Sequence, residues 1–133
     1  MITREDIDQR VESLAALVAV AEGLNGDGDD LSELYSAVVD CAYFFFCALF
    51  DTGIDNAGPN YGDIEEDVRD KVRAAMDTFP PKIKNALAVR VFSEAAAEEY
   101  RRRGPYQIYK VDSAVFYPYV TKIRWIYGKD FEN

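Results

Sequence analysis

The sequence contains no histidine, and its 133 residues include only two cysteines, Cys41 and Cys47. The absence of histidine removes the commonest general base and the commonest metal ligand. Two cysteines without histidine cannot complete a standard zinc site. Because the two thiols are six residues apart, they point about 240° apart on a helix and cannot pair with each other. We expect two small buried thiols in a reduced, cytoplasmic protein without a metal site.

Recognisable catalytic, cofactor and phosphate-binding motifs are also missing. The loop after residue 23 resembles a calcium loop only briefly, because Asp30 and Ser36 stand where that loop requires Gly and Glu. Asp40 is a single acid in an apolar segment, and we expect it either at the rim of the helix or against an Arg or Tyr of another helix, because a buried charge needs a partner. The sequence therefore predicts no catalytic residues, no cofactor and no enzymatic activity.

Apolar residues recur at helical spacing, which predicts an all-α fold in one domain over residues 1–133. Thr3 is a plausible N-cap for a first helix that ends near Gly23. A second helix covers about 31–52 with Gly53 as its C-cap, and others cover about 63–79 and 82–103. We expect a bundle of four to five helices around the second, apolar one.

Within the second helix, the seventeen residues from Leu34 to Phe50 form an apolar run in which Asp40 is the single charge. This run reaches only the lower edge of the length that spans a bilayer, about 17 to 25 residues. Since a helix that is apolar all round in a soluble protein is surrounded by other helices, we expect this one to be enclosed, with no membrane contact.

The C-terminal segment, residues 105–133, is rich in aromatic and basic residues. Helical spacing favours a fifth helix after Asp112 and Ser113. Its β-branched and aromatic composition, together with Pro118, is typical of a β-hairpin instead, with strands near 106–111 and 115–127. Both alternatives place this tail against the bundle.

The net charge of −9 is unevenly distributed along the chain. Residues 1–70 contain 17 acidic and 3 basic side chains, whereas residues 71–133 contain 7 acidic and 12 basic ones. Four acids share one face of the third helix at i, i+3, i+4 and i+7 spacing: Asp63, Glu66, Asp67 and Asp70. With Asp27, Asp29 and Asp30 of the preceding loop, they form a candidate surface for a basic partner.

Basic and aromatic residues at the other end of the chain form a candidate secondary interface: Arg101, Arg102, Arg103, Tyr117, Tyr119 and Trp125. Such residues are common in protein-interface hot spots and also bind single-stranded nucleic acid. Because the chain is acidic overall, we rank direct nucleic-acid binding below protein binding.

A short, acidic chain without motifs has the general profile of immunity proteins and of phage-borne anti-defence proteins such as anti-CRISPRs. The sequence predicts an inhibitor that binds a basic nuclease or nucleic-acid-binding complex and competes with nucleic acid. One alternative is a self-associating helical adaptor, in its simplest form a homodimer, with the aromatic tail as its interface. Another is a ligand-binding bundle with a cavity lined by Tyr43, Phe44, Phe45 and Phe46.

Overall fold

The computed structural model describes residues 3–24, 29–55, 64–103 and 113–128, apart from the side chains of 29–32, 102–103 and 113–116. Within these ranges the chain is all-α, as predicted. The helices are α1 (Arg4–Gly23), α2 (Asp29–Asp55), α3 (Ile64–Asp77), α4 (Pro81–Arg103) and α5 (Ser113–Tyr127).

Local sequence sets the ends of several helices. The hydroxyl of Thr3 accepts a hydrogen bond from the Asp6 backbone N–H at 3.1 Å, and Asp6 Oδ2 accepts one from the Thr3 backbone N–H at 3.0 Å. This capping box starts α1 as predicted. The hydrogen bonds from Thr3 also hold the pKa of Asp6 below its ordinary value. Pro81 opens α4, where a missing backbone N–H costs nothing.

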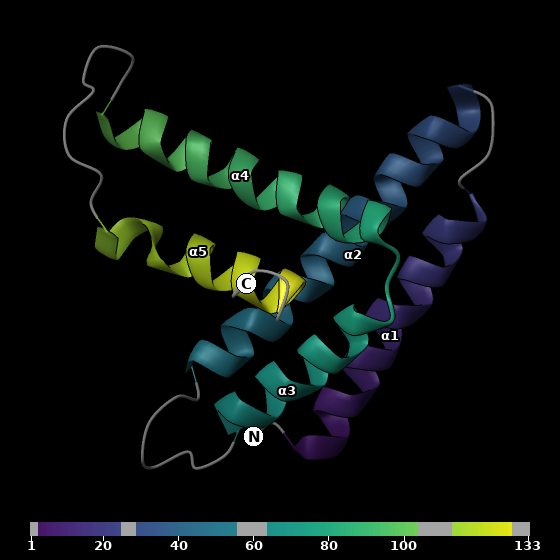
Figure 1. Cartoon of the computed structure of the whole chain (residues 1–133), viewed down its shortest axis with the longest axis horizontal. Coiled ribbons are helices and arrows are strands. Elements are labelled where there is room, and N and C mark those ends of the chain that lie inside the picture. Colours follow the sequence, from purple (N-terminus) through teal and green to yellow (C-terminus); the bar gives the residue numbers. More distant parts are fainter. Residues whose placement is uncertain (1–2, 25–28, 56–63, 104–112, 129–133) are drawn as a thin grey trace.

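The helices form two groups (Figure 1). Helix α2 runs antiparallel to both α1 and α3, which lie beside it, while α4 and α5 form an antiparallel hairpin that crosses α2. Contacts of α5 with α3 and of α4 with α2 join the hairpin to the other three helices. The tail is therefore helical over residues 113–127, and the hairpin alternative is wrong for that range; residues 105–112 lie outside the described residues.

The core lies where the two groups meet, around one side of α2. Phe46 and Leu49 of α2 are completely buried, and so are Val68, Val72 and Met76 of α3. The ring of Phe50 meets that of Trp125 edge-on, with centroids 4.9 Å apart. This aromatic contact fixes α5 against α2.

Gly53 lies inside α2 rather than capping it, because the helix continues to Asp55. A Cβ atom at Gly53 would meet the Trp125 ring at 3.0 Å and Val68 at 3.5 Å. The predicted C-cap is therefore wrong. Glycine instead allows α5 and α3 to approach the α2 backbone closely at this position.

The expectation that α2 is enclosed on all sides is also wrong. Phe44 is 72% exposed and Leu34 is 50% exposed, although both belong to the apolar run. Cys41 is exposed and Cys47 is only half-buried, which corrects the expectation of two buried thiols.

One segment of the described chain, Glu33–Asp55 in α2, is long and apolar enough to cross a membrane, with 23 residues and a mean hydropathy of 1.6. Since the core helix of a soluble protein meets the same criteria, this is weak evidence for a membrane span.

Phe44 and Phe46 lie on different sides of α2, so replacing each by alanine should affect the free energy of unfolding very differently. Phe46→Ala removes a completely buried ring and should lower the free energy of unfolding by about 3–5 kcal/mol. Phe44→Ala removes an exposed ring and should change it by less than about 0.5 kcal/mol. Urea unfolding of both variants measures the difference. Equal losses would show that α2 is rotated differently or enclosed.

Candidate functional site

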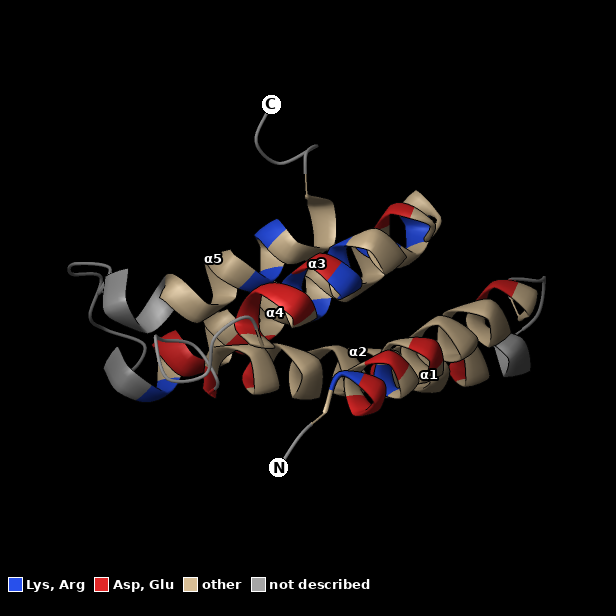
Figure 2. Cartoon of the chain, turned by 90° about the horizontal axis from the view of Figure 1, so that it is seen from below, with Lys and Arg blue, Asp and Glu red and all other residues tan. Residues whose placement is uncertain are grey.

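The described residues form two candidate binding surfaces. One is an acidic face on α1 and α3, and the other is a groove between α2 and α4. Figure 2 places the charges on the helices, and between Asp40 and Asp51 α2 contains no charged residue. Helices α1, α2 and α3 contain sixteen acidic and five basic residues, whereas α4 and α5 contain three acidic and eight basic residues. The charge asymmetry of the sequence is thus an asymmetry between the two groups of helices.

The predicted acidic stripe on α3 is only partly present as expected. Glu66 and Asp70 are exposed on the outer side of α3, and Arg69 lies 3.9 Å and 3.4 Å from their respective carboxylates. The side chain of Asp67 is only 21% exposed and lies 3.3 Å from Lys71. Asp67 therefore belongs to the contact with α1 rather than to the outer stripe. Asp63 lies outside the described residues.

Ion pairs between α1 and α3 bring additional acids to this surface. Lys71 of α3 lies 2.6 Å from Asp8 of α1, and Arg4 of α1 lies 4.0 Å from Asp67. Burial opposes the charge on Lys71, but hydrogen bonds to Asp8 and then Asp67 outweigh it and raise the pKa of Lys71. Five exposed acids in the first halves of the adjacent helices α1 and α3 define what is here called the acidic face: Glu5, Asp8, Glu12, Glu66 and Asp70.

Sequence reasoning missed the part of the acidic face that α1 contributes. Glu5, Asp8 and Glu12 have i, i+3, i+7 spacing, so the sequence does place them on one side of a helix. Only the packing of α1 against α3, with Asp8 paired to Lys71, brings this side of α1 beside α3. Of the loop acids, Asp27 lies outside the described residues, and so do the side chains of Asp29 and Asp30 in the first turn of α2.

The predicted secondary interface is divided by the fold. Tyr117 is 63% exposed, and Arg101 is exposed and lies 2.7 Å from Glu98. Trp125 is only 3% exposed and belongs to the core, while the ring of Tyr119 packs below Lys122. The side chains of Arg102 and Arg103 lie outside the described residues. The aromatic tail therefore does not present Trp125 to a partner.

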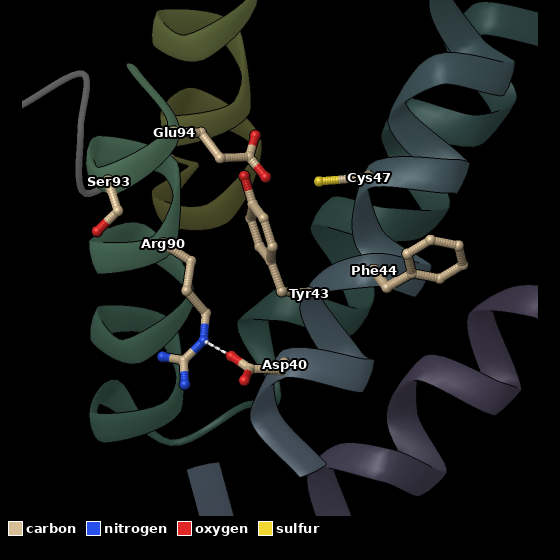
Figure 3. A pocket seen from close by; sticks show the side chains of 7 residues that line it. All are labelled: Asp40, Tyr43, Phe44, Cys47, Arg90, Ser93 and Glu94. Carbon is tan, nitrogen blue, oxygen red and sulfur yellow. Dashed lines mark hydrogen bonds and ion pairs between the residues drawn. The ribbon is translucent and has the colours of Figure 1, made fainter. Parts of the chain in front are cut away.

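The groove between α2 and α4 has a volume of about 370 Å³ and opens to solvent. Its lining residues are Asp40, Tyr43, Phe44, Cys47, Arg90, Ser93 and Glu94. Figure 3 shows Tyr43 and Cys47 pointing from α2 toward Glu94 on α4, while Phe44 points away from α4 at the rim. Of the four aromatic residues predicted to line a cavity, Tyr43 and Phe44 do so, whereas Phe46 is in the core and Phe45 is partly buried against it.

An ion pair closes one end of the groove. Arg90 Nε donates a hydrogen bond to Asp40 Oδ1 at 2.6 Å, and its NH1 group donates to the Ala86 carbonyl at 2.9 Å (Figure 3). This contact answers the question that Asp40 raises in the sequence. Asp40 lies at the exposed rim of α2 and meets an arginine of another helix, as predicted.

A buried cation lies behind the groove. Lys122 of α5 is 8% exposed, and its Nζ is 3.7 Å from Glu94 Oε2. The same ammonium lies 5.4 Å from the ring centroid of Phe50 and 6.0 Å from that of Tyr43, distances at which the faces of aromatic rings attract a cation. Lys122 and Glu94 thereby link α5, α4 and α2.

The hydroxyl of Tyr43 is buried and has no hydrogen-bond partner among the described residues. Burial raises the pKa of Tyr43 far above its ordinary value of 10.0, and the adjacent Cys47 and Glu94 raise it further. Burial also raises the pKa of the Cys47 thiol, partly offset by Tyr43 and Lys122. Both groups therefore stay protonated at neutral pH, which suits hydrogen-bond donation rather than nucleophilic attack.

Comparison with protein-family models, with curated proteins and with solved structures finds no match to this chain.

Replacing Tyr43 tests the unpartnered hydroxyl. Because an unsatisfied buried hydroxyl costs free energy, Tyr43→Phe should raise the free energy of unfolding by about 1 kcal/mol. As the pH rises above 10, the unfolded wild type ionises at Tyr43 while the folded state stays neutral, so stability is lost. Tyr43→Phe should lose less stability over that range in urea titrations.

Tyr117→Phe is the matched control, since Tyr117 is exposed and does not line the groove. It should leave the stability near neutral pH unchanged. A Tyr43→Phe variant that is less stable than wild type by 1 kcal/mol or more would show that the hydroxyl has a partner in solution.

Proposed function

We propose that this protein binds and inhibits a basic nuclease or nucleic-acid-binding complex, in the manner of toxin-immunity or phage anti-defence proteins of the anti-CRISPR type. The observation that carries this proposal is the acidic face, which consists of five exposed carboxylates on the adjacent helices α1 and α3, joined by the ion pair between Lys71 and Asp8. A partner that binds nucleic acid presents a basic groove, and a surface of carboxylates competes for it.

The cations on α1 and α3 do not cancel this surface. Lys71 and Arg69 pair with acids of the acidic face, yet the two helices together contain ten acidic and five basic residues. Lys71 joins the helices rather than pointing freely outward, since its side chain is 29% exposed. The surplus of negative charge therefore remains available to attract a cationic partner and to speed its association.

The alternative of self-association through the aromatic tail has less support. Tyr117 and Val120 are exposed on α5 and offer some apolar area. Trp125, the largest side chain of the predicted interface, is buried within the chain itself. Since Trp is the residue most enriched in hot spots, its burial weakens this alternative.

Charge reversal tests the acidic face. In assays with a panel of purified toxin and RNA-guided nucleases, wild type should block cleavage by at least one of them and displace its labelled nucleic acid. Glu66→Lys with Asp70→Lys should weaken that inhibition about tenfold, which corresponds to about 1.4 kcal/mol of binding free energy. Raising the salt from 50 to 300 mM should weaken wild-type binding as well.

The control replaces two exposed acids outside the acidic face, Glu22→Lys with Asp55→Lys, and changes the net charge equally. It should reduce inhibition by less than about threefold, because screening limits the effect of distant charges. Equal losses in both double variants would show that net charge alone matters. Full inhibition by the Glu66 and Asp70 variant would exclude the acidic face.

A further inference from the structure

An apolar surface of α2 is left uncovered by the described residues. Five exposed residues define this α2 apolar face: Leu34, Ala37, Cys41, Phe44 and Ala48. Their steps of three, four, three and four residues are those of a heptad seam, the pattern by which one helix receives another. The seam is about 21 Å long at 1.5 Å per residue. Its length and spacing therefore suit a partner helix of about four turns.

The groove beside Phe44 gives this face a pocket. It holds about 370 Å³, and its wall contains the buried Tyr43 hydroxyl that lacks a partner among the described residues. Glu94, whose side chain is 48% exposed, stands opposite Tyr43 (Figure 3). An apolar side chain of a bound helix fits this space, and a polar group beside it can pair with the hydroxyl. This feature is independent of the heptad spacing and also points to an occupant.

The charges beside the α2 apolar face favour one kind of binding partner over others. Helix α2 contains six acidic residues and no basic residue, and exposed Glu33 and Asp51 lie along one edge of the apolar face, as does Asp40, which pairs with Arg90. A second copy of this chain would place acids against acids across a symmetric contact. An anionic lipid surface would meet the same repulsion. A helix with Lys and Arg beside its apolar stripe meets opposite charges instead.

We propose that the α2 apolar face and the adjoining groove bind an amphipathic helix of the partner whose apolar stripe is flanked by Lys and Arg. The proposal rests on the proposed function for the basic character of that partner and adds the surface that holds it. The acidic face attracts the partner at long range. Phe44 and the groove supply the desolvated contact that keeps it bound.

Three synthetic helical peptides of twenty residues test the proposal by titration into the full-length protein at 150 mM salt. The first has a leucine stripe at the complementary heptad positions with Lys and Arg on both flanks. The second has the same stripe with Glu flanks, and the third keeps the cations but replaces leucine with glutamine. The first should bind at least about tenfold more tightly than either of the others.

Two phenylalanine variants show whether binding uses the proposed surface. Phe44→Ala should weaken binding of the first peptide about tenfold or more, as expected for a central aromatic anchor. Phe92→Ala is the matched control, because Phe92 is 61% exposed on α4 and does not line the groove. It should change the affinity less than about twofold.

Several results would overturn the proposal. Equal binding of the first and second peptides would show that flanking charge does not select the partner. Unchanged affinity of Phe44→Ala for the first peptide would show that the α2 apolar face is not where it binds. A dimer in light scattering that Phe44→Ala dissociates would assign the face to a second copy. Binding to vesicles that Phe44→Ala abolishes would assign it to lipid.

The two proposals fail in different ways. If the protein binds the first peptide through Phe44 but inhibits no nuclease in the panel, the proposal for the α2 apolar face stands and the proposed function is wrong. If the wild type and Phe44→Ala inhibit a nuclease equally well and neither binds the first peptide, the proposed function stands and the α2 apolar face is not the binding surface. The Glu66 and Asp70 charge reversal should leave peptide affinity within about threefold, since those acids lie on α3.

Discussion

The structure depends on how an apolar helix of 27 residues is shielded from water. Helix α2 contains more apolar surface than any other helix of the chain, and each of α1, α3 and α4 packs on part of it. Burial of Phe46, Leu49 and Phe50 supplies the main hydrophobic contribution at this centre. Packing against α1 and α3 covers one side, and the hairpin of α4 and α5 crosses at another (Figure 1). Helices of these lengths leave the outer side of α2 in water.

Two ion pairs border the groove between α2 and α4. Arg90 reaches across to Asp40, and Lys122 reaches from α5 to Glu94. The space between the two contacts is lined by Tyr43 and Cys47, whose polar atoms stay protonated because burial disfavours their charged forms. Ion pairs thus border this groove, as they also join α1 to α3.

The sequence was sufficient to predict the helical fold, most helix ends to within a few residues and the rim position of Asp40 beside an Arg or Tyr, because these depend on local spacing and on simple chemistry. Thr3 and Pro81 act through neighbours in the chain. The direction in which α2 faces was not predictable in the same way. When nearly every position of a helix is apolar, the sequence contains no signal that separates Phe44 from Phe46, and only the placement of the other helices decides which ring is buried. Gly53 was misread for the same reason, since the ring that requires it belongs to Trp125, 72 residues later.

The acidic face shows where spacing ceases to be informative. Helical periodicity correctly groups Glu66 with Asp70, but it also groups them with Asp67, which turns toward α1. Once Lys71 joins Asp8 to α3, the acids of α1 enter the same surface, and the charge pattern becomes a property of two helices rather than one. The α2 apolar face is likewise a property of the assembled bundle. A long-range attraction and an uncovered apolar seam have complementary uses in recognition, because the former raises the rate of encounter and the latter lowers the rate of dissociation. The acidic face belongs to α1 and α3 and the seam to α2, so the proposed partner needs both a basic surface for the first and an amphipathic helix for the second.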